Sequence, residues 1–178
     1  MTVSPAVFDQ LRARATDAQS EVHELATWSG VAAFALELAG SEDVAVTPTL
    51  AAARPELASA LGARMRLPDP AAPFESVADA AVGVAEGVLA VAESGSVLLS
   101  HAERADRAVS MLSRIGIQVV PRDKVVASLD DAAGWLEASE GSISLATLVT
   151  GPSRTADIER SLTIGVQGPS DLHLVILG

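Results

Sequence analysis

The segment Glu93-Ser94-Gly95-Ser96 carries side chains that could act on a small ligand. It follows the strand-like run Val88–Ala92, and in parallel sheets ligands bind beyond the carboxyl ends of strands. Glu93 is therefore a candidate catalytic base or nucleophile. Ser94, Gly95 and Ser96 are candidate ligand-binding residues, because a glycine lets backbone N–H groups approach a ligand. The same residues also suit an ordinary polar hairpin turn, and this alternative stays open.

A second candidate segment, Gly151-Pro152-Ser153-Arg154-Thr155-Ala156-Asp157, follows the strand-like run Leu145–Thr150. We expect a helix over Pro152–Arg160, whose unpaired N–H groups and positive dipole end would attract a small anion. The candidate ligand-binding residues here are Gly151, Ser153, Arg154, Thr155 and Asp157. In the alternative interpretation, Ser153 only caps the helix and Asp157 only complements its dipole. The segment is not a P-loop, because the Gly-Lys-Ser/Thr ending is missing.

A third segment, Gly165-Val166-Gln167-Gly168-Pro169, predicts a tight connection before the last strand. Gln167 and Gly168 are candidate ligand-binding residues if this loop closes over a site built by the first two segments. The histidines, at positions 23, 101 and 173, show no metal-ligand spacing, so we expect no metal site. No Gly-x-Ser-x-Gly nucleophile elbow occurs.

Two helices are expected before residue 41. A stripe of apolar residues at steps of three and four predicts one helix, which begins at Ser4 and Pro5; the stripe consists of Phe8, Leu11, Ala15, Ala18, Val22 and Leu25. A second helix is expected over Val31–Leu38, ending at Gly40. Residues 1–40 would then form a helical arm, which either docks on the domain's own core or binds a partner or a second copy of the chain.

Residues 41–178 predict an α/β core. Short apolar runs alternate with helical patterns, which favours an α/β fold with a mostly parallel sheet. Strands are expected over Asp43–Thr47, Ala63–Leu67, Val88–Ala92, Val97–Leu99, Ile117–Val120, Leu145–Thr150 and Leu172–Leu177. Besides Pro152–Arg160, helices are expected over Pro55–Ala63, Asp106–Arg114 and Lys124–Ala138. The three prolines in Pro68–Pro73 mark a loop and not a domain boundary, so residues 1–178 are expected to form a single domain.

Composition removes several classes of function. The chain has 178 residues and no cysteine, so it cannot form disulfides, thiolate zinc sites or an iron–sulfur cluster of its own. Its formal net charge of −11 disfavours binding to nucleic acid or to an anionic membrane surface. No run of about 18 uncharged apolar residues exists, and no basic residue occurs in the first ten. We therefore expect a soluble cytoplasmic protein.

Taken together, Gly87–Ser100, Asp106–Val120 and Gly151–Leu177 resemble the lactate utilization protein C family, also called LUD-domain proteins. The most specific stretch is Gly151–Glu159, and Glu93–Ser96 is similar to the family's Glu-Thr-Gly-Thr turn. Gln167 stands where the family commonly has His, and Ser113 where it commonly has Pro. The resemblance implies a three-layer α/β/α domain like that of the NagB, RpiA and CoA-transferase proteins. It also implies a role in oxidising L-lactate to pyruvate alongside iron–sulfur partner proteins, with no cofactor in this chain.

Three hypotheses follow from these features. The first is an accessory, cluster-free component of an L-lactate utilization system that binds a small carboxylate or phosphate at the first two segments. The second is a free-standing enzyme, of the sugar-phosphate isomerase or acyl-transfer type, that uses Glu93. The third is a structural interaction protein, in which residues 1–40 bind a partner or form a homo-oligomer.

Overall fold

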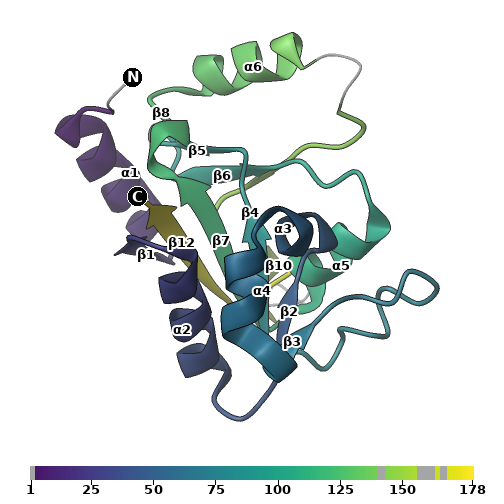
Figure 1. The fold of residues 1–178 in the computed structure, drawn as a ribbon. Helices are drawn as coiled ribbons and strands as arrows, with labels where there is room; N and C mark the ends of the chain where they lie inside the picture. The colour runs from purple at the N-terminus through teal and green to yellow at the C-terminus, as the bar shows by residue number, and fades with distance from the viewer. Residues whose placement is uncertain (1–2, 140–142, 156–162, 165–167) are drawn as a thin grey trace.

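The computed structural model describes residues 3–139, 143–155, 163–164 and 168–178, in which strands alternate with helices. Its centre is a six-stranded sheet in which all neighbouring strands are parallel (Figure 1). The strands, in spatial order, are β1 (Ser20–Leu25), β12 (Asp171–Leu177), β7 (Ile115–Pro121), β4 (Val82–Glu86), β2 (Val44–Val46) and β3 (Met65–Arg66). The central strands are almost continuously apolar because both faces of the sheet are covered.

Three helices cover one face of the sheet: α2 (Trp28–Ala39), α3 (Pro48–Ala53) and α4 (Pro55–Leu61). Helix α2 begins where Thr27 Oγ1 accepts a hydrogen bond from Gly30 N at 3.1 Å, and it ends at Gly40, whose φ is 58°. Val31 of α2 and Leu57 of α4 are fully buried against Val84 and its neighbours in the sheet. This face carries the largest apolar core of the domain.

The opposite face carries α1 (Pro5–Asp17), α5 (Arg104–Leu112) and a small four-stranded sheet. The small sheet has the order β8 (Val125–Val126), β5 (Leu89–Val91), β6 (Ser96–Leu99) and β9 (Thr147–Val149). Leu11 of α1 packs with Leu99 of β6 and Leu174 of β12 in the second core. The result is the three-layer α/β architecture expected from the sequence.

Two further elements lie outside these layers. Helix α6 (Leu129–Ala138) packs on the small sheet through Ala132, and Figure 1 shows it at the top of the molecule. A capping box begins it, because the Ser128 and Asp131 side chains bond to each other's backbone N–H groups. Strands β10 (Arg154–Thr155) and β11 (Thr163–Ile164) form a separate antiparallel pair. Two 3₁₀ turns complete the described elements, at Gly62–Arg64 and Arg122–Lys124.

The expectation of one helix reaching Leu25 is wrong. Helix α1 ends at Asp17, Gln19 has a positive φ of 66°, and Ser20–Leu25 is an edge strand that pairs with β12. The apolar spacing fitted a helix because apolar residues lie on both faces of this strand. Val22 packs in the second core, with α1, and Leu25 packs in the largest core, with α2. Residues 1–40 therefore contribute to both cores, together with residues from 41–178.

The expected helices Lys124–Ala138 and Pro152–Arg160 also need correction. The first begins only at Leu129, because Val125–Val126 is strand β8. In the second range, Arg154–Thr155 is strand β10, and residues 156–162 lie outside the described part of the chain. Strand β4, Val82–Glu86, was not expected from the sequence. Helix α3 and strand β11 were not expected either, and the remaining strands and helices occur close to their expected positions. None of the described helices is long and apolar enough to cross a membrane.

Candidate functional site

The Glu93–Ser96 segment forms the turn of the β5–β6 hairpin, so the hairpin alternative describes its backbone correctly. Gly95 has a φ of 69°, and its N–H donates to the Val91 carbonyl at 2.9 Å. A Cβ at Gly95 would lie 2.4 Å from the Ala15 nitrogen, because the turn packs directly on α1. The turn therefore lies at the end of an antiparallel strand in the small sheet and not at the carboxyl edge of the parallel sheet.

The Glu93 carboxylate has a structural partner. It is exposed, and its Oε2 accepts a hydrogen bond from Leu129 N at 2.9 Å. Leu129 is the first residue of α6, so Glu93 satisfies one of the unpaired N–H groups at that helix start. The side chain contributes to neither of the two cavities described below.

The first predicted segment contacts the strand that leads into the second, and no cavity is lined by both segments among the described residues. Strands β6 and β9 pair, and this pairing brings Ser96 Oγ to 2.6 Å from Thr150 Oγ1 and 2.8 Å from Ser94 Oγ. Gly151 follows with a φ of 75°, and a Cβ there would lie 2.0 Å from the Ala18 carbonyl oxygen. The three hydroxyl groups bond to one another, and Ser96 is fully buried. They therefore tie the small sheet together.

The remaining predicted ligand-binding residues come after Gly151 and before strand β12 in the chain. Ser153 N donates to the Pro169 carbonyl at 3.0 Å, and a Cβ on Gly168 would lie 3.2 Å from the Ser153 Cβ. Arg154 and Thr155 lie in strand β10, where a helix start was expected. Asp157 and Gln167 are outside the described residues.

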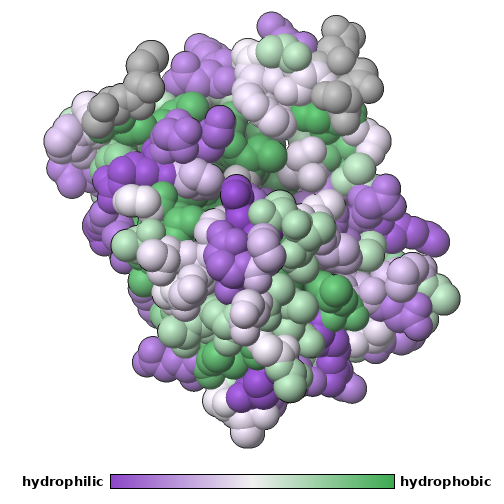
Figure 2. Space-filling view, in the orientation of Figure 1, coloured by the Kyte–Doolittle hydropathy of each residue, from purple (hydrophilic) through white to green (hydrophobic). Residues whose placement is uncertain are grey.

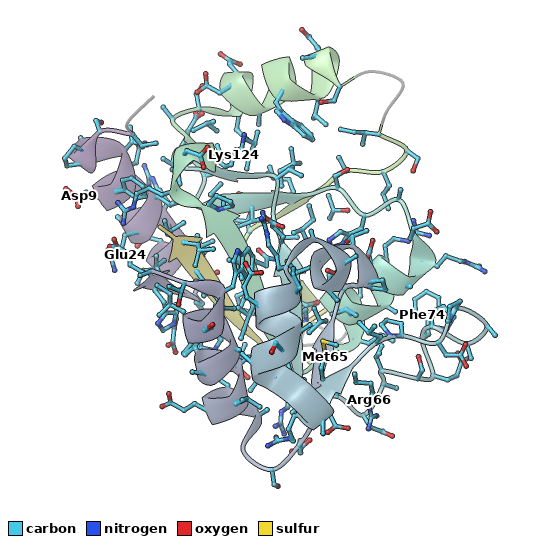
Figure 3. The ribbon with its side chains drawn as sticks, viewed as in Figure 1. Asp9, Glu24, Met65, Arg66, Phe74 and Lys124 are labelled. Atoms are coloured by element: carbon cyan, nitrogen blue, oxygen red, sulfur yellow. The ribbon has the colours of Figure 1, made fainter. Side chains whose placement is uncertain are left out.

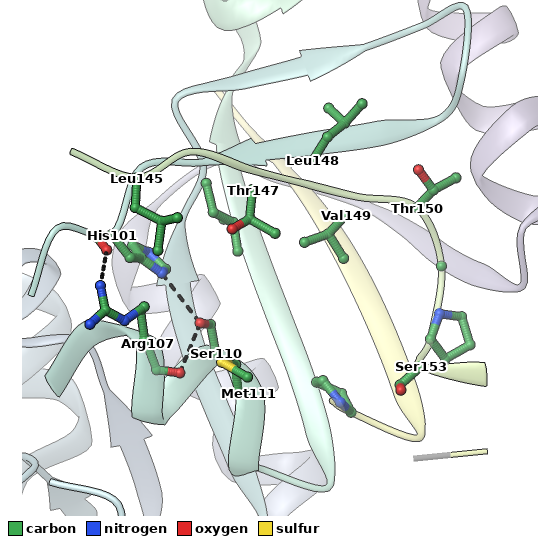
Figure 4. A pocket seen from close by; sticks show the side chains of 14 residues that line it. His101, Arg107, Ser110, Met111, Leu145, Thr147, Leu148, Val149, Thr150 and Ser153 are labelled. Carbon is green, nitrogen blue, oxygen red and sulfur yellow. Dashed lines mark hydrogen bonds between the residues drawn. The ribbon is translucent and has the colours of Figure 1, made fainter. Parts of the chain in front are cut away.

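Gly151 and Ser153 line a cavity of about 460 Å³ between α5 and β9, which we call the α5 cavity (Figure 4). His101 lies on its wall, with its Nδ1 3.3 Å from Ser110 Oγ. Arg107 Nη1 donates to the carbonyls of His101 at 3.3 Å and Ala102 at 3.1 Å. Burial lowers the pKa of His101, so its imidazole is neutral at pH 7. Most of the other lining side chains are apolar.

A second cavity, of about 480 Å³, lies where strands β2, β4 and β7 end, and we call it the carboxyl-edge cavity. From β2 the chain continues to β3 on one side, whereas from β4 it continues to β7 on the other. This is a topological switch point, the usual ligand position in open parallel sheets. Its polar lining comes from four stretches of the chain and consists of Thr49, Arg54, Glu86, Ser100, His101 and Lys124. Trp135 and Val88 contribute to its apolar wall. Figure 2 shows hydrophobic surface beneath α6.

Two cations converge on the carboxyl-edge cavity. Arg54 Nη2 donates to Glu86 Oε1 at 2.8 Å, and this hydrogen bond raises the pKa of Arg54. Its guanidinium also lies over the Trp28 ring, 5.1 Å from the centroid. Lys124, labelled in Figure 3, is the only lysine of the chain. Within the described residues it forms no ion pair, so its ammonium is available to an anion.

Sequence patterns did not single out Arg54, Glu86 or Lys124, and His101 lines both cavities. One usable signal was present: Glu86-Gly87 directly follows the apolar run Ala80–Ala85 and marks the end of a buried strand. A second was the single lysine in a strongly acidic chain.

The sequence model of the LUD domain matches residues 9–177, nearly the whole chain. The chain belongs to the LUD domain family. The resemblance inferred from the motifs is thereby confirmed.

Individual relatives agree with this membership. The LUD domain is 32% identical over 108 residues to lactate utilization protein C of Geobacillus thermodenitrificans, covering 58% of this chain and 45% of that one. It is 37% identical over 99 residues to lactate utilization protein C of Shouchella clausii, covering 54% and 43%. These matches span less than half the length of the curated relatives. A DUF162 family protein from Deinococcus radiodurans has the same fold, with a TM-score of 0.75, 24% identity and 99% coverage of both chains.

Proposed function

We propose that this LUD domain is an accessory component of lactate utilization that binds a small carboxylate or phosphate in the carboxyl-edge cavity. The observation that carries the proposal is the convergence of Arg54 and Lys124 on one cavity at the switch point of the sheet. An anion bound there would take its charge partner from Lys124 and would compete with Glu86 for the Arg54 guanidinium.

The meeting of Arg54 and Lys124 in one cavity is notable because the chain as a whole is strongly acidic. Acidic residues outnumber basic ones by 23 to 12 in the whole chain, so an excess of cations over carboxylates in one cavity runs against the composition. Here one carboxylate, Glu86, faces two cations and the hydroxyls of Thr49 and Ser100. Hydroxyl groups and cations together suit a carboxylate with a neighbouring oxygen, as in lactate and pyruvate.

The lactate assignment rests on the relatives that are named lactate utilization protein C. Because the chain has no cysteine, an iron–sulfur cluster that takes electrons from lactate would have to be held by a partner protein. In this proposal the LUD domain binds and presents a small anion, and redox chemistry takes place elsewhere in the system.

Ligand binding can be tested by calorimetric titration of the full chain with L-lactate, pyruvate and inorganic phosphate. Lys124→Gln should weaken binding about tenfold, or ~1.4 kcal/mol, the size expected for one charge-assisted contact. Arg104→Gln is a matched control, because Arg104 is an exposed cation outside the cavity, and it should leave binding nearly unchanged. Absence of binding by all three anions, or equal losses in both variants, would overturn the proposed site.

The cellular role needs its own test. Deletion of the gene should prevent growth on L-lactate as the carbon source, and the intact chain should restore growth. Affinity purification from lactate-grown cells should recover iron–sulfur proteins. Normal growth of the deletion strain would contradict the lactate role and would leave the anion site to be judged by the titrations alone.

A further inference from the structure

Strands β1 and β12 bring together three side chains that are far apart in the sequence. The parallel register places Glu21 beside His173, and His23 lies two residues after Glu21. Because alternate residues of a strand point to the same face, Glu21, His23 and His173 all lie on the face that α2 covers. The three residues form a Glu-His-His cluster at one edge of the main sheet.

The potential ligand atoms of this cluster are close enough to share one ion. His23 Nε2 lies 3.1 Å from His173 Nδ1. Glu21 Oε2 lies 3.7 Å from the His23 nitrogen and 3.6 Å from the His173 nitrogen. In a tetrahedral zinc site with bonds of 2.0–2.2 Å, neighbouring ligand atoms are about 3.3–3.5 Å apart. The observed triangle therefore needs shifts of only a few tenths of an ångström to hold such an ion.

We propose that Glu21, His23 and His173 bind a divalent transition-metal ion of the zinc type. Two imidazoles and one carboxylate are a known zinc ligand set with room for a fourth, exchangeable ligand. An imidazole suits zinc, copper and nickel better than magnesium or calcium, which prefer all-oxygen sites. The ligand set thus defines the chemical class of the ion.

The surroundings hold the two imidazoles in place. The Phe34 ring of α2 packs against both, with ring centroids 4.5 Å from His23 and 5.4 Å from His173. His173 is almost fully buried and His23 is about two-thirds buried, so little side-chain freedom remains to be lost on binding. Each neutral imidazole can carry its proton on the ring nitrogen that does not face the cluster. Binding therefore requires a tautomer choice and no large rearrangement.

The fourth coordination position of such an ion could face a neighbouring cavity. A cavity of about 290 Å³ adjoins the cluster and is lined by Gln19, Glu21, Asp171 and His173. Water or a small ligand in that cavity could occupy the fourth position. The cluster lies near the amino ends of β1 and β12, at the edge of the sheet opposite to the carboxyl-edge cavity. The metal proposal is therefore independent of the proposed anion site.

The test is titration of the full, tag-free chain with Zn²⁺ by calorimetry, after removal of bound metal. Wild type should bind one ion per chain, and Zn²⁺ should raise its melting temperature because the ion binds only the folded state. His23→Gln and Glu21→Gln alter side chains on the edge strand and should each weaken Zn²⁺ binding at least about tenfold. His101→Gln removes the histidine outside the cluster and is the matched control, with affinity unchanged.

Titration with Co²⁺ gives a second readout that does not depend on stability. Wild type should develop the visible absorption of tetrahedral Co²⁺ bound to nitrogen and oxygen, and Zn²⁺ should displace it. Circular dichroism identifies any variant that fails to fold. If His23→Gln does not fold, Glu21→Gln still tests the site, because the Glu21 side chain is exposed. No saturable binding to wild type, or equal affinity in wild type, Glu21→Gln and His23→Gln, would show that the histidines form only a hydrogen-bonded pair.

Discussion

Arg54 Nη2 lies 2.8 Å from Glu86 Oε1, and this contact spans the switch point of the parallel sheet. Arg54 comes from the segment after β2, and Glu86 ends β4. The Glu86 carboxylate neutralises Arg54, whereas Lys124, the other cation of the carboxyl-edge cavity, forms no ion pair with any residue that the structure describes. The affinity of this cavity for anions is therefore set partly by a group of the protein itself.

Glu86→Gln should tighten pyruvate binding severalfold, because it removes a negative charge from the cavity and releases the guanidinium of Arg54. The cost in stability should be at most about 1 kcal/mol, since both side chains are partly exposed. Calorimetric titration measures the first effect and urea denaturation the second. Glu37→Gln, an exposed glutamate of α2, is the charge-matched control. Weaker pyruvate binding in Glu86→Gln would show that Glu86 contacts the ligand as a hydrogen-bond acceptor.

Glu93→Ala should lower the free energy of unfolding by about 0.5–1 kcal/mol, because Leu129 N at the start of α6 loses its acceptor. Glu93→Gln keeps an acceptor oxygen and should lose less. Neither variant should alter anion binding, because Glu93 does not line the carboxyl-edge cavity. A tenfold loss of binding in a folded Glu93→Gln protein would restore Glu93 as a ligand-contacting residue and revive the enzyme hypothesis.

Two threonines should respond to the same substitution with opposite signs. Thr47 Oγ1 is buried and has no hydrogen-bond partner among the residues that the structure describes, so Thr47→Val should raise the free energy of unfolding by up to about 1 kcal/mol. Thr27 Oγ1 caps α2 through Gly30 N, so Thr27→Val should lower it by about 1 kcal/mol. Urea denaturation of the two variants, side by side, measures the difference. Destabilisation by both would mean that the Thr47 hydroxyl has a partner in solution.

Acidification should destabilise the fold through His101. Burial lowers its folded-state pKa below the ordinary value of 6.5, so the unfolded chain binds more protons as the pH falls below about 7. The stabilisation is complete above pH 6.5 and is lost as the pH falls towards the folded-state pKa. His101→Asn should therefore show a shallower loss of stability between pH 7 and pH 5 than wild type.

Two other histidines still titrate in that variant. Burial also lowers the pKa of His23 and of His173, so the pH dependence should be reduced and not abolished. Denaturant titrations at several pH values provide the measurement. Parallel curves for wild type and His101→Asn would show that the His101 side chain is solvated in the folded state.

Features that depend on local pattern could be predicted before the structure was known. Apolar runs such as Ile117–Val120 specify buried parallel strands, and Gly40 ends α2. The ordered motifs at Glu93 and Gly151 identified the family. These signals are reliable because backbone conformation and burial are encoded by neighbouring residues. The same logic failed over Val22–Leu25, where helical spacing also fits a strand whose two faces are both covered.

The contacts between polar groups of distant segments could not be predicted in this way. Arg54 and Glu86 come together because β2 and β4 are neighbours, and His23 meets His173 across 150 residues because the last strand pairs with the first. The spacing of residues in the sequence does not reveal such contacts, because they depend on the order of the strands in the sheet. That order is set by how the helices bury the faces of the sheet. The candidate sites of this LUD domain therefore depend on long-range strand pairing, whereas many of its individual strands and helices follow from local pattern.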